Sequence, residues 1–340
     1  MENKKILIIQ TAFIGDVILA TSLVEYIKNQ HPTNHVDFLL RDGNQSILET
    51  NPFIKKLWIW NKSKGKYRSL ISLVFGIRKE KYDYAINIQR FFNSGLLTCL
   101  SGAKKKIGFK KNPLSIFFTH RIEHRIPDAR EDIFLHEVQR NLNLLFPLIN
   151  ENMPSAQQLK TKLYFNDKDK KVISTLSLAD DYIVLAPSSV WYTKQWPIEK
   201  WDALIKLCHS KFQIILIGAP DDREYLKPLE NNQNTLNLAG NLSLRQSALL
   251  MKNAKRVFVN DSAPLHLASS VNAKTTAIFC STVPDFGYFP LSDDHEVIQL
   301  TPRLSCMPCG LHGHSSCPKG HFKCALNIDE KNVFNTIRQI

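Results

Sequence analysis

Three short polar segments, each following an apolar run, hold the residues whose types and spacing could do chemistry. In the first segment a single glycine, Gly15, precedes the carboxylate of Asp16 at the start of an expected helix. A carboxylate in this place can cap the helix by accepting its free amide hydrogens, or it can take a proton from a substrate hydroxyl. Both interpretations of Asp16 stay open at this point.

The second segment, Ala186–Pro197, lies between an expected strand and an expected helix. It contains Lys194 together with the hydroxyl groups of Ser188, Ser189 and Thr193. An ammonium group that supplies charge, beside hydroxyls that donate hydrogen bonds, is typical of a phosphate site. The alternative is an exposed lysine without a ligand.

The third segment is another strand-to-helix loop, in which Ser262 is followed by Ala263 and Pro264. Ser262 is a suitable helix cap and Pro264 suits the first helical turn, so the amides after Ser262 are expected to point outward and bind an anion. Asp261 either caps this helix or repels an anion. His266 is either a structural residue or a ligand contact.

Four cysteines close to the end of the chain form a separate cluster. They are Cys306, Cys309, Cys317 and Cys324, and three histidines lie among them. Four soft ligands with one C-x-x-C pair predict a structural zinc site. Reduced thiols, or a disulfide formed on oxidation, are the alternative.

The elements that must position these segments alternate between strands and helices. Strands are expected at 5–10, 35–40, 82–88, 182–186, 213–218, 256–260 and 275–279, and helices at 17–29, 67–79, 198–210, 243–253 and 263–271. This alternation predicts an α/β fold with two doubly wound, Rossmann-like parallel sheets. We expect a first domain over 1–160, a second over 161–325 with a cysteine-rich tail at 306–324, and a C-terminal helix over 326–340. Loops that follow strands in two such domains are expected to line a central cleft.

Composition excludes several classes of protein. With 44% hydrophobic and 22% charged residues in 340, the chain is neither disordered nor fibrous, and it contains no apolar run of the length that spans a membrane. The first ten residues do not read as a secretory signal, and seven cysteines, an odd number, favour a reducing compartment. The glycine motifs of dinucleotide oxidoreductases and P-loop nucleotidases are absent.

The net charge of +13 favours anionic partners such as nucleotides, phosphorylated lipids or nucleic acids. Basic residues concentrate at 62–68, 104–111 and 121–130. A basic, zinc-containing nucleic-acid-binding protein is therefore one alternative. The sequence contains no helix-turn-helix and no RNA-recognition signature, so we expect no nucleic-acid partner.

Three stretches, Ile6–Thr21, Pro187–Pro197 and Asn260–Ala268, resemble in order the motifs of the ADP-heptose:lipopolysaccharide heptosyltransferase family, glycosyltransferase family nine. The resemblance implies a GT-B fold, with the acceptor on the amino-terminal side of the cleft and the nucleotide sugar on the carboxy-terminal side. Two positions depart from the family pattern. Gln10 stands where many members have lysine, and Ala263 stands where they have glycine.

The resemblance also implies roles for single residues. Asp16 is expected to be the general base, with Thr11 and Gly15 on the acceptor side. Lys194 is expected to contact the donor phosphates, assisted by Ser188, Ser189 and Thr193, while Asp261, Ser262, Ala263 and His266 surround the diphosphate. A carboxylate in the segment 217–224, either Asp222 or Glu224, is expected to reach the nucleotide ribose.

The implied function is inverting transfer of heptose from ADP-heptose to an anionic, lipid-linked saccharide of the lipopolysaccharide core. No metal is expected to be required for catalysis, because lysine and helix amides stabilise the leaving diphosphate. The protein is expected in the cytoplasm, bound peripherally to the inner face of the inner membrane. A GT-B transferase with another sugar nucleotide, or with a protein or different glycan as acceptor, stays open.

Overall fold

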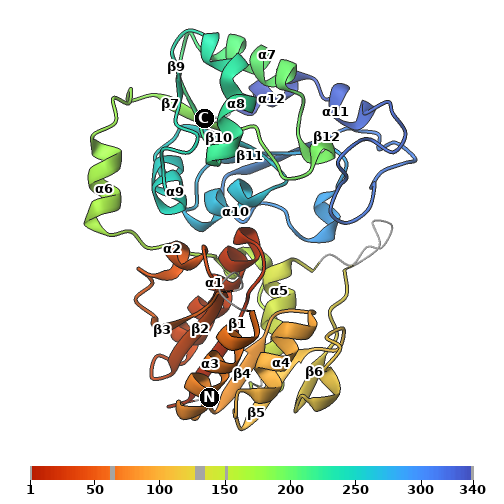
Figure 1. The fold of residues 1–340 in the computed structure, drawn as a ribbon. Coiled ribbons are helices and arrows are strands. Elements are labelled where there is room, and N and C mark those ends of the chain that lie inside the picture. Colours follow the sequence, from red (N-terminus) through yellow and green to blue (C-terminus); the bar gives the residue numbers. More distant parts are fainter. Residues whose placement is uncertain (1, 62–65, 127–134, 150–151, 338–340) are drawn as a thin grey trace. The chain divides into compact units, whose positions relative to one another are not determined.

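The computed structural model describes residues 2–61, 66–126, 135–149 and 152–337 (Figure 1). Two compact units divide the chain. The first comprises Met1–Ile126 and Leu135–Tyr164, and the second includes everything from Phe165 onward. The boundary thus follows Tyr164, shortly after the expected boundary at residue 160. Among the described residues, no helix has the length and apolarity that crossing a bilayer requires.

Unit 1 is built on one parallel sheet with the strand order β3-β2-β1-β4-β5-β6. Its strands are β1 (Lys5–Ile9), β2 (His35–Arg41), β3 (Ile54–Trp60), β4 (Tyr84–Asn87), β5 (Lys105–Phe109) and β6 (His120–Ile122). Its helices are α1 (Ile14–Gln30), α2 (Gln45–Leu48), α3 (Lys66–Lys79), α4 (Phe92–Leu100) and α5 (Glu137–Leu142), with short 3-10 turns η1 (Ser115–Phe117), η2 (Asn143–Leu145) and η3 (Ala156–Gln158). Three of these strands, β3, β5 and β6, are additions to the sequence-based expectation.

The centre of this sheet is β1, whose apolar run places Ile6 to Ile9 entirely out of solvent. It pairs in parallel with β2 on one side and with β4 on the other. Leu7 and Ile9 contribute to a core that also holds Leu73 and Ile77 of α3 and Leu97 of α4. The two helices therefore cover one face of the sheet, as the ribbon in Figure 1 shows.

Unit 2 repeats this plan with the strand order β12-β11-β10-β7-β8-β9. Its strands are β7 (Tyr182–Ala186), β8 (Gln213–Leu216), β9 (Thr235–Asn237), β10 (Arg256–Asn260), β11 (Thr275–Phe279) and β12 (His295–Gln299). Its helices are α6 (Asp167–Ser174), α7 (Ile198–Cys208), α8 (Arg223–Leu226), α9 (Leu244–Lys252), α10 (Ala263–Ser270), α11 (Lys323–Leu326) and α12 (Glu330–Asn335), with 3-10 turns η4 (Tyr192–Lys194), η5 (Pro220–Asp222), η6 (Lys227–Asn231) and η7 (Pro284–Phe286).

Aromatic packing anchors the core of unit 2 near the predicted phosphate segment. Trp196 and Trp201 are both fully buried, and their rings meet edge to face with centroids 5.2 Å apart. Val333 and Phe334 of α12 join the same core. The C-terminal helix expected over 326–340 is therefore the short α12, and it is an integral part of unit 2.

Both sheets confirm the predicted doubly wound α/β fold, since every strand pair in them is parallel. In each sheet the strand order reverses at one point, between β1 and β4 in unit 1 and between β7 and β10 in unit 2. Ligands of open α/β sheets bind beyond the carboxyl ends of the strands at this switch point. The predicted segments follow β1, β7 and β10, which are strands at these two points.

Candidate functional site

Asp16 lies inside the first turn of α1, which begins at Ile14 rather than at Val17 as expected. The N-cap of this helix is Phe13, whose backbone is extended, so the interpretation of Asp16 as the N-cap residue is wrong. The carboxylate instead accepts a hydrogen bond from the amide of Phe13, as the third residue of a helix does in a capping box. Gly15, in the same turn, is half-buried.

The surroundings of Asp16 suit a proton acceptor. Burial, reinforced by the negative charge of Glu137, raises the pKa of Asp16 from its ordinary value of 3.8 to about 6, while the amide of Phe13 and the charge of Arg90 oppose the rise. A general base works best when its pKa lies near the operating pH. Asp16 is therefore deprotonated near neutral pH and still basic enough to take a proton.

Glu137 belongs to a buried charged cluster that sequence reasoning missed. Its carboxylate is 2.7 Å from Nε of Arg140 and 3.1 Å from Nε2 of His124. Burial alone would raise the pKa of Glu137, but the hydrogen bond from His124 and the charge of Arg140 outweigh burial and hold this pKa at about 2. Glu137 thus carries a fixed negative charge. No local sequence pattern predicts this cluster near Asp16, because its residues are far from Asp16 along the chain.

A cavity of about 290 Å³ lies at the switch point of unit 1. Thr11, on its wall, donates through its hydroxyl at 2.7 Å and its amide at 3.1 Å to Oε1 of Gln89, which follows β4. The other lining residues are Ala12, Phe13, Arg41, Trp60, Phe91, Asn93 and Ser94. Hydroxyl, amide and guanidinium groups beside exposed aromatic rings can hold a sugar. The sequence predicted Thr11 here and missed Gln89 and Arg41.

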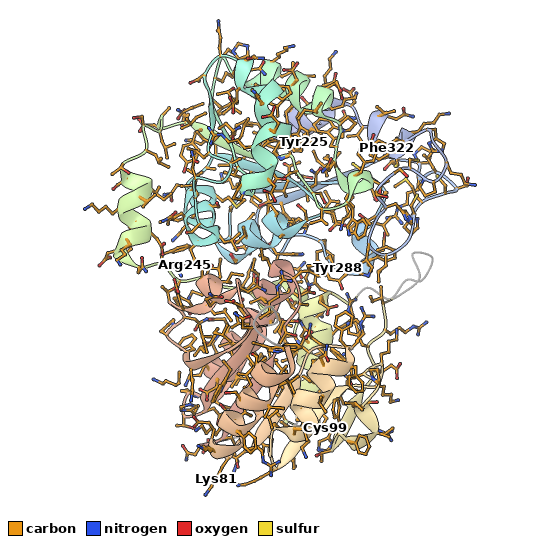
Figure 2. All side chains as sticks on the ribbon, in the orientation of Figure 1. Lys81, Cys99, Tyr225, Arg245, Tyr288 and Phe322 are labelled. Atoms are coloured by element: carbon orange, nitrogen blue, oxygen red, sulfur yellow. The ribbon has the colours of Figure 1, made fainter. Side chains whose placement is uncertain are left out.

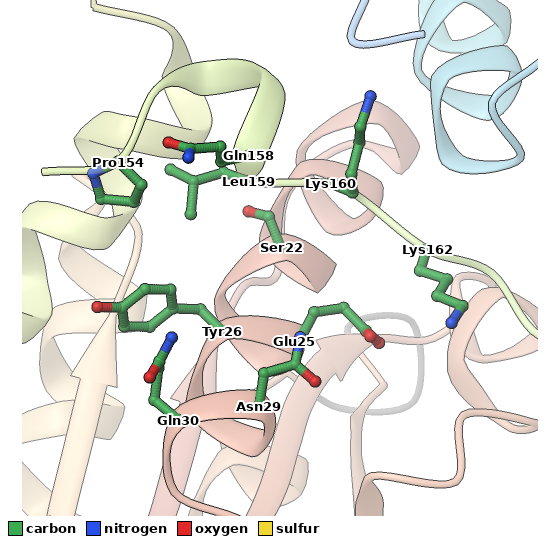
Figure 3. Close-up of a pocket in the computed structure, with 10 residues that line it drawn as sticks. All are labelled: Ser22, Glu25, Tyr26, Asn29, Gln30, Pro154, Gln158, Leu159, Lys160 and Lys162. Carbon is green, nitrogen blue, oxygen red and sulfur yellow. The ribbon is translucent and has the colours of Figure 1, made fainter. Parts of the chain in front are cut away.

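A second cavity of unit 1, of about 390 Å³, lies along the later turns of α1 (Figure 3). Ser22, Glu25 and Tyr26 line one side, and the segment from Pro154 to Lys162 lines the other. The hydroxyl of Tyr164 donates to the buried carboxylate of Glu25 at 3.0 Å. Since Gly15 and Asp16 occupy the first turn of α1 and do not line it, this cavity is separate from the predicted site.

Lys194 in unit 2 has a charged partner. Its Nζ lies 2.7 Å from Oδ2 of Asp261, and the two side chains are only 15% and 10% exposed. The hydroxyl of Thr282 donates to the same oxygen at 2.6 Å. Two predicted residues, from the loops after β7 and β10, are therefore in direct contact. Asp261 does not cap α10; it holds the ammonium group of Lys194.

The start of α10 matches the predicted anion site in one respect and differs in another. Ser262 is the N-cap residue as predicted, and its backbone is extended. Its side chain makes no capping hydrogen bond. Pro264 has no amide hydrogen, and the amide of Leu265 donates to the carbonyl of Ser262 at 3.0 Å, so the amide of Ala263 is the first-turn donor best placed for an anion. Ala263 is half-buried at the first position, whereas His266 is buried with its ring 6.4 Å from that of Tyr288. Ala263 can meet a ligand more readily than His266.

Asn260, at the end of β10, joins two of the predicted segments. Its side-chain oxygen accepts from the amide of Trp196 at 3.0 Å, and its side-chain nitrogen donates to the carbonyl of Pro187 at 2.6 Å. Asn260 is fully buried, so these bonds hold both ends of the Lys194 loop against β10. The sequence placed Asn260 in the third motif but did not predict this function.

The predicted hydroxyl and carboxylate residues of the donor site differ in their contacts and exposure. Ser188 donates to Oδ2 of Asp222 at 2.8 Å, which joins the loops after β7 and β8. Ser189 is half-buried, and its carbonyl accepts from Gln195. Glu224 is 85% exposed, and its carboxylate lies 3.5 Å from Nζ of Lys227. Asp222 is tied to the loop after β7 through Ser188, so of the two predicted carboxylates it is the better placed to reach a nucleotide ribose.

Thr193 is buried and supports the loop. Its hydroxyl accepts from the hydroxyl of Ser281 at 3.0 Å and from the amide of His314 at 2.8 Å, while its own amide donates to the carbonyl of His314 at 3.1 Å. Thr193 therefore positions the loop, and its contact with a ligand stays a prediction. Next to it, Gly313 has φ of +79°, and a Cβ there would lie 2.9 Å from Cγ of Lys194. The tail thus packs tightly against the Lys194 turn.

The four clustered cysteines are all free thiols. Cys306 Sγ lies 3.9 Å from Nε2 of His321, and the amide of Phe322 donates to Sγ of Cys317 at 3.4 Å. Burial raises the pKa of the Cys324 thiol to about 12. Within the described parts of the chain, no group of three or more histidine, cysteine or acidic side chains is arranged to hold a metal ion. Zinc binding by these cysteines stays a prediction.

Comparison with known proteins gives consistent matches. The family model described as Glycosyltransferase family 9 (heptosyltransferase) matches residues 70–318. Lipopolysaccharide heptosyltransferase 3 of Escherichia coli is 25% identical over 281 residues, covering 79% of this chain and 82% of that protein. Lipopolysaccharide heptosyltransferase 1 of Campylobacter coli is 24% identical over 351 residues, covering 99% and 98%.

Solved structures share this fold. The E. coli ADP-heptose lps heptosyltransferase II superimposes with a TM-score of 0.79 at 20% identity and covers 98% of each chain. A family 9 glycosyl transferase from Veillonella parvula DSM 2008 gives a TM-score of 0.83 at 21% identity, covering 100% of this chain and 97% of that one. These likenesses confirm the predicted GT-B fold.

Proposed function

The chain belongs to glycosyltransferase family 9, the heptosyltransferase family, and on this premise we propose that it transfers heptose from ADP-heptose to a saccharide of the lipopolysaccharide core. The observation that carries the proposal is the contact of Lys194 with Asp261 beside the uncapped start of α10. An ammonium group beside the backbone amides at the start of a helix is a suitable site for a diphosphate. Heptose as the transferred sugar and lipopolysaccharide as the acceptor are inferred from its relatives, which are lipopolysaccharide heptosyltransferases.

The reaction divides between two sets of residues. Asp16, whose pKa is raised to about 6, accepts the proton of the acceptor hydroxyl as that oxygen attacks the anomeric carbon of the heptose. The bond from the anomeric carbon to the diphosphate breaks on the opposite face, so the configuration inverts. Negative charge then grows on the leaving ADP, where Lys194 and the amides at Ser262 and Ala263 stabilise it. We propose that catalysis needs no metal.

Acceptor binding is assigned to the cavity at the switch point of unit 1. Thr11 and Gln89 offer hydrogen-bonding groups there, and Arg41 lies with its guanidinium 5.6 Å from the ring centre of Phe13. A guanidinium group suits the acidic sugars and phosphates of an anionic acceptor. The net charge of +13 agrees with such an acceptor and with peripheral binding to the cytoplasmic face of the inner membrane.

Thermal stabilisation by nucleotides tests the donor. A ligand that binds only the native state raises the melting temperature according to its affinity. ADP should stabilise the protein more than UDP, GDP or CMP at equal concentration, with or without magnesium. A preference for UDP or GDP would indicate a donor other than ADP-heptose. A response to oligonucleotides alone would favour the nucleic-acid alternative.

A direct transfer assay completes the test. ADP-heptose is incubated with a lipopolysaccharide core acceptor that lacks its heptose, and the product is weighed by mass spectrometry. An increase by one heptose residue, accompanied by release of ADP, is the expected result. Absence of transfer to every core acceptor, together with transfer to a protein or another glycan, would reassign the acceptor.

A further inference from the structure

Large apolar side chains gather on the solvent side of α4 and η1 in unit 1. Five of them, named here the apolar patch, are strongly exposed: Phe91 by 61%, Phe92 by 54%, Leu100 by 39%, Ile116 by 69% and Phe117 by 62%. Single exposed apolar residues are common on protein surfaces, but a contiguous group marks a surface that binds a partner or a membrane.

One buried side chain makes these residues a single surface. Asn112, only 1% exposed, donates to the carbonyls of Gln89 at 3.1 Å and Phe91 at 2.9 Å. It packs so closely against α4 that a Cβ on Gly95 would lie 2.2 Å from its Oδ1. The turn that carries η1 is therefore fixed to the start of α4, which brings Phe91 and Phe92 into one rigid region with Ile116 and Phe117.

The neighbouring helix extends the patch. Ile71 and Phe75, one turn apart on α3, are 53% and 64% exposed. Arg78, in the last turn of α3, donates to the carbonyl of Leu100 at 3.5 Å, so the end of α3 adjoins the end of α4. The two helices lie side by side over the sheet in Figure 1, and Cys99 marks this region of α4 in Figure 2.

Positive charge lies beside this surface. The stretch 104–111 contains five lysines and no acidic residue. Lys110 and Lys111 are exposed and directly precede the turn that carries η1, while the charge of Lys106 acts on the thiol of Cys99 in α4. Nζ of Lys110 lies 3.2 Å from Oε2 of Glu123, but both side chains are more than half exposed, so water screens this pair and Lys110 can still meet a phosphate. Exposed aromatic residues beside lysines match the interface of an anionic bilayer, where the rings enter the headgroup layer and the ammonium groups meet phosphates.

We propose that the apolar patch, with Lys106, Lys110 and Lys111, is the surface by which this protein binds an anionic lipid bilayer. The proposal rests on the proposed function for its purpose, because Phe91 belongs both to the patch and to the wall of the acceptor cavity. A saccharide attached to a lipid in that bilayer would therefore reach the cavity along the edge of the patch.

Vesicle binding by matched variants tests this surface. The full chain is mixed with vesicles of pure phosphatidylcholine or of phosphatidylcholine with phosphatidylglycerol, and bound protein is measured by sedimentation. The double variant Ile116→Ser/Phe117→Ser should bind anionic vesicles at least about tenfold more weakly than the wild type. Lys110→Gln/Lys111→Gln should lose between about fivefold and 25-fold in vesicle binding, because each lysine near an anionic surface contributes up to about fivefold.

Controls come from unit 2. Leu326, 47% exposed, and the exposed Lys211 allow Leu326→Ser and Lys211→Gln, which should bind vesicles as the wild type does. Equal binding by the patch variants and the wild type would overturn the proposal. A patch variant that changes the molar mass in light scattering without lipid would also overturn it, since the surface would then join copies of this chain.

A deacylated acceptor separates this proposal from the proposed function. The Ile116→Ser/Phe117→Ser variant should transfer heptose to a deacylated core saccharide at the wild-type rate, because neither residue lines the acceptor cavity. If the wild type transferred nothing to that saccharide while vesicle binding still responded to the variants as expected, the proposed function would fail and the membrane surface would stand.

Discussion

Lys194→Ala should weaken ADP binding through two different effects. The variant removes the ammonium group that we propose contacts the diphosphate, and it leaves the carboxylate of Asp261 in a nearly closed environment without its partner at 2.7 Å. At an effective dielectric constant near 20, two unit charges about 4 Å apart interact by roughly 4 kcal/mol. Truncating one member of a buried charge pair typically costs about 2–5 kcal/mol. We therefore expect ADP affinity to fall between about 100-fold and 1000-fold.

A second substitution tests the role of Asp261 in this loss. In Lys194→Ala/Asp261→Asn, the carboxylate that would repel the diphosphate is absent, so at least about tenfold of the lost affinity should return. The assay is titration calorimetry with ADP at one fixed, low salt concentration. Lys200→Ala is the control, since Lys200 is paired at 2.9 Å with Glu330 in the same unit and has no predicted donor contact.

Three results would contradict this reasoning. Unchanged ADP affinity in Lys194→Ala would show that Lys194 does not contact the donor. If the double variant bound ADP no better than Lys194→Ala, Asp261 would not lie near the diphosphate, and the cost would come from the ammonium group alone. A matching loss in Lys200→Ala would assign the effect to the stability of unit 2.

Three further predictions concern the base and the cysteines. Asp16→Asn should reduce transfer by about 100-fold to 10,000-fold with little change in ADP affinity. Because folding raises the pKa of Asp16 from 3.8 to about 6, ionised Asp16 destabilises the folded protein, and this cost is complete above pH 6. The variant should therefore unfold at a higher temperature than the wild type at about pH 7.5, and a lower melting temperature would contradict the assignment. Wild-type kcat/KM should fall as the pH drops through about 6, because Asp16 becomes protonated. In Glu137→Gln this fall should occur at lower pH, because a negative charge that raises the pKa of Asp16 is removed, and an unchanged pH profile would exclude that coupling. Elemental analysis of protein purified without added metal should find one zinc per chain if the four C-terminal cysteines form the predicted site, with Cys306→Ser/Cys309→Ser as the variant that loses it, and metal-free protein would favour reduced thiols.

The strands that the sequence predicted best are those buried on both faces. β7, β10 and β11 begin and end where expected, because each has an apolar or β-branched centre and is buried throughout. β3 was missed, since Lys55 and Lys56 are exposed at the edge of the sheet and interrupt its apolar pattern. Edge strands that are open to water need no continuous apolar run.

The candidate site divides in a similar way. Lys194 and Asp261 could be predicted because each lies in the loop after a buried strand, and parallel strands bring their carboxyl ends together. Gln89 and Glu137 could not, because their importance depends on contacts between segments far apart in the sequence. Local patterns in a single sequence do not determine which distant loops meet.

The packing of the tail against the Lys194 turn has a consequence for biosynthesis. The hydrogen bond from the His314 amide to Thr193 joins residues 121 positions apart, and the carbonyl of Ser281 accepts from the amide of Cys309 in the same region. A ribosome releases the chain from its amino end, so all strands of both sheets emerge before residue 314. The Lys194 turn is thus among the last parts of unit 2 to be fixed, and a nascent chain would have both sheets outside the ribosome before it could hold the proposed donor.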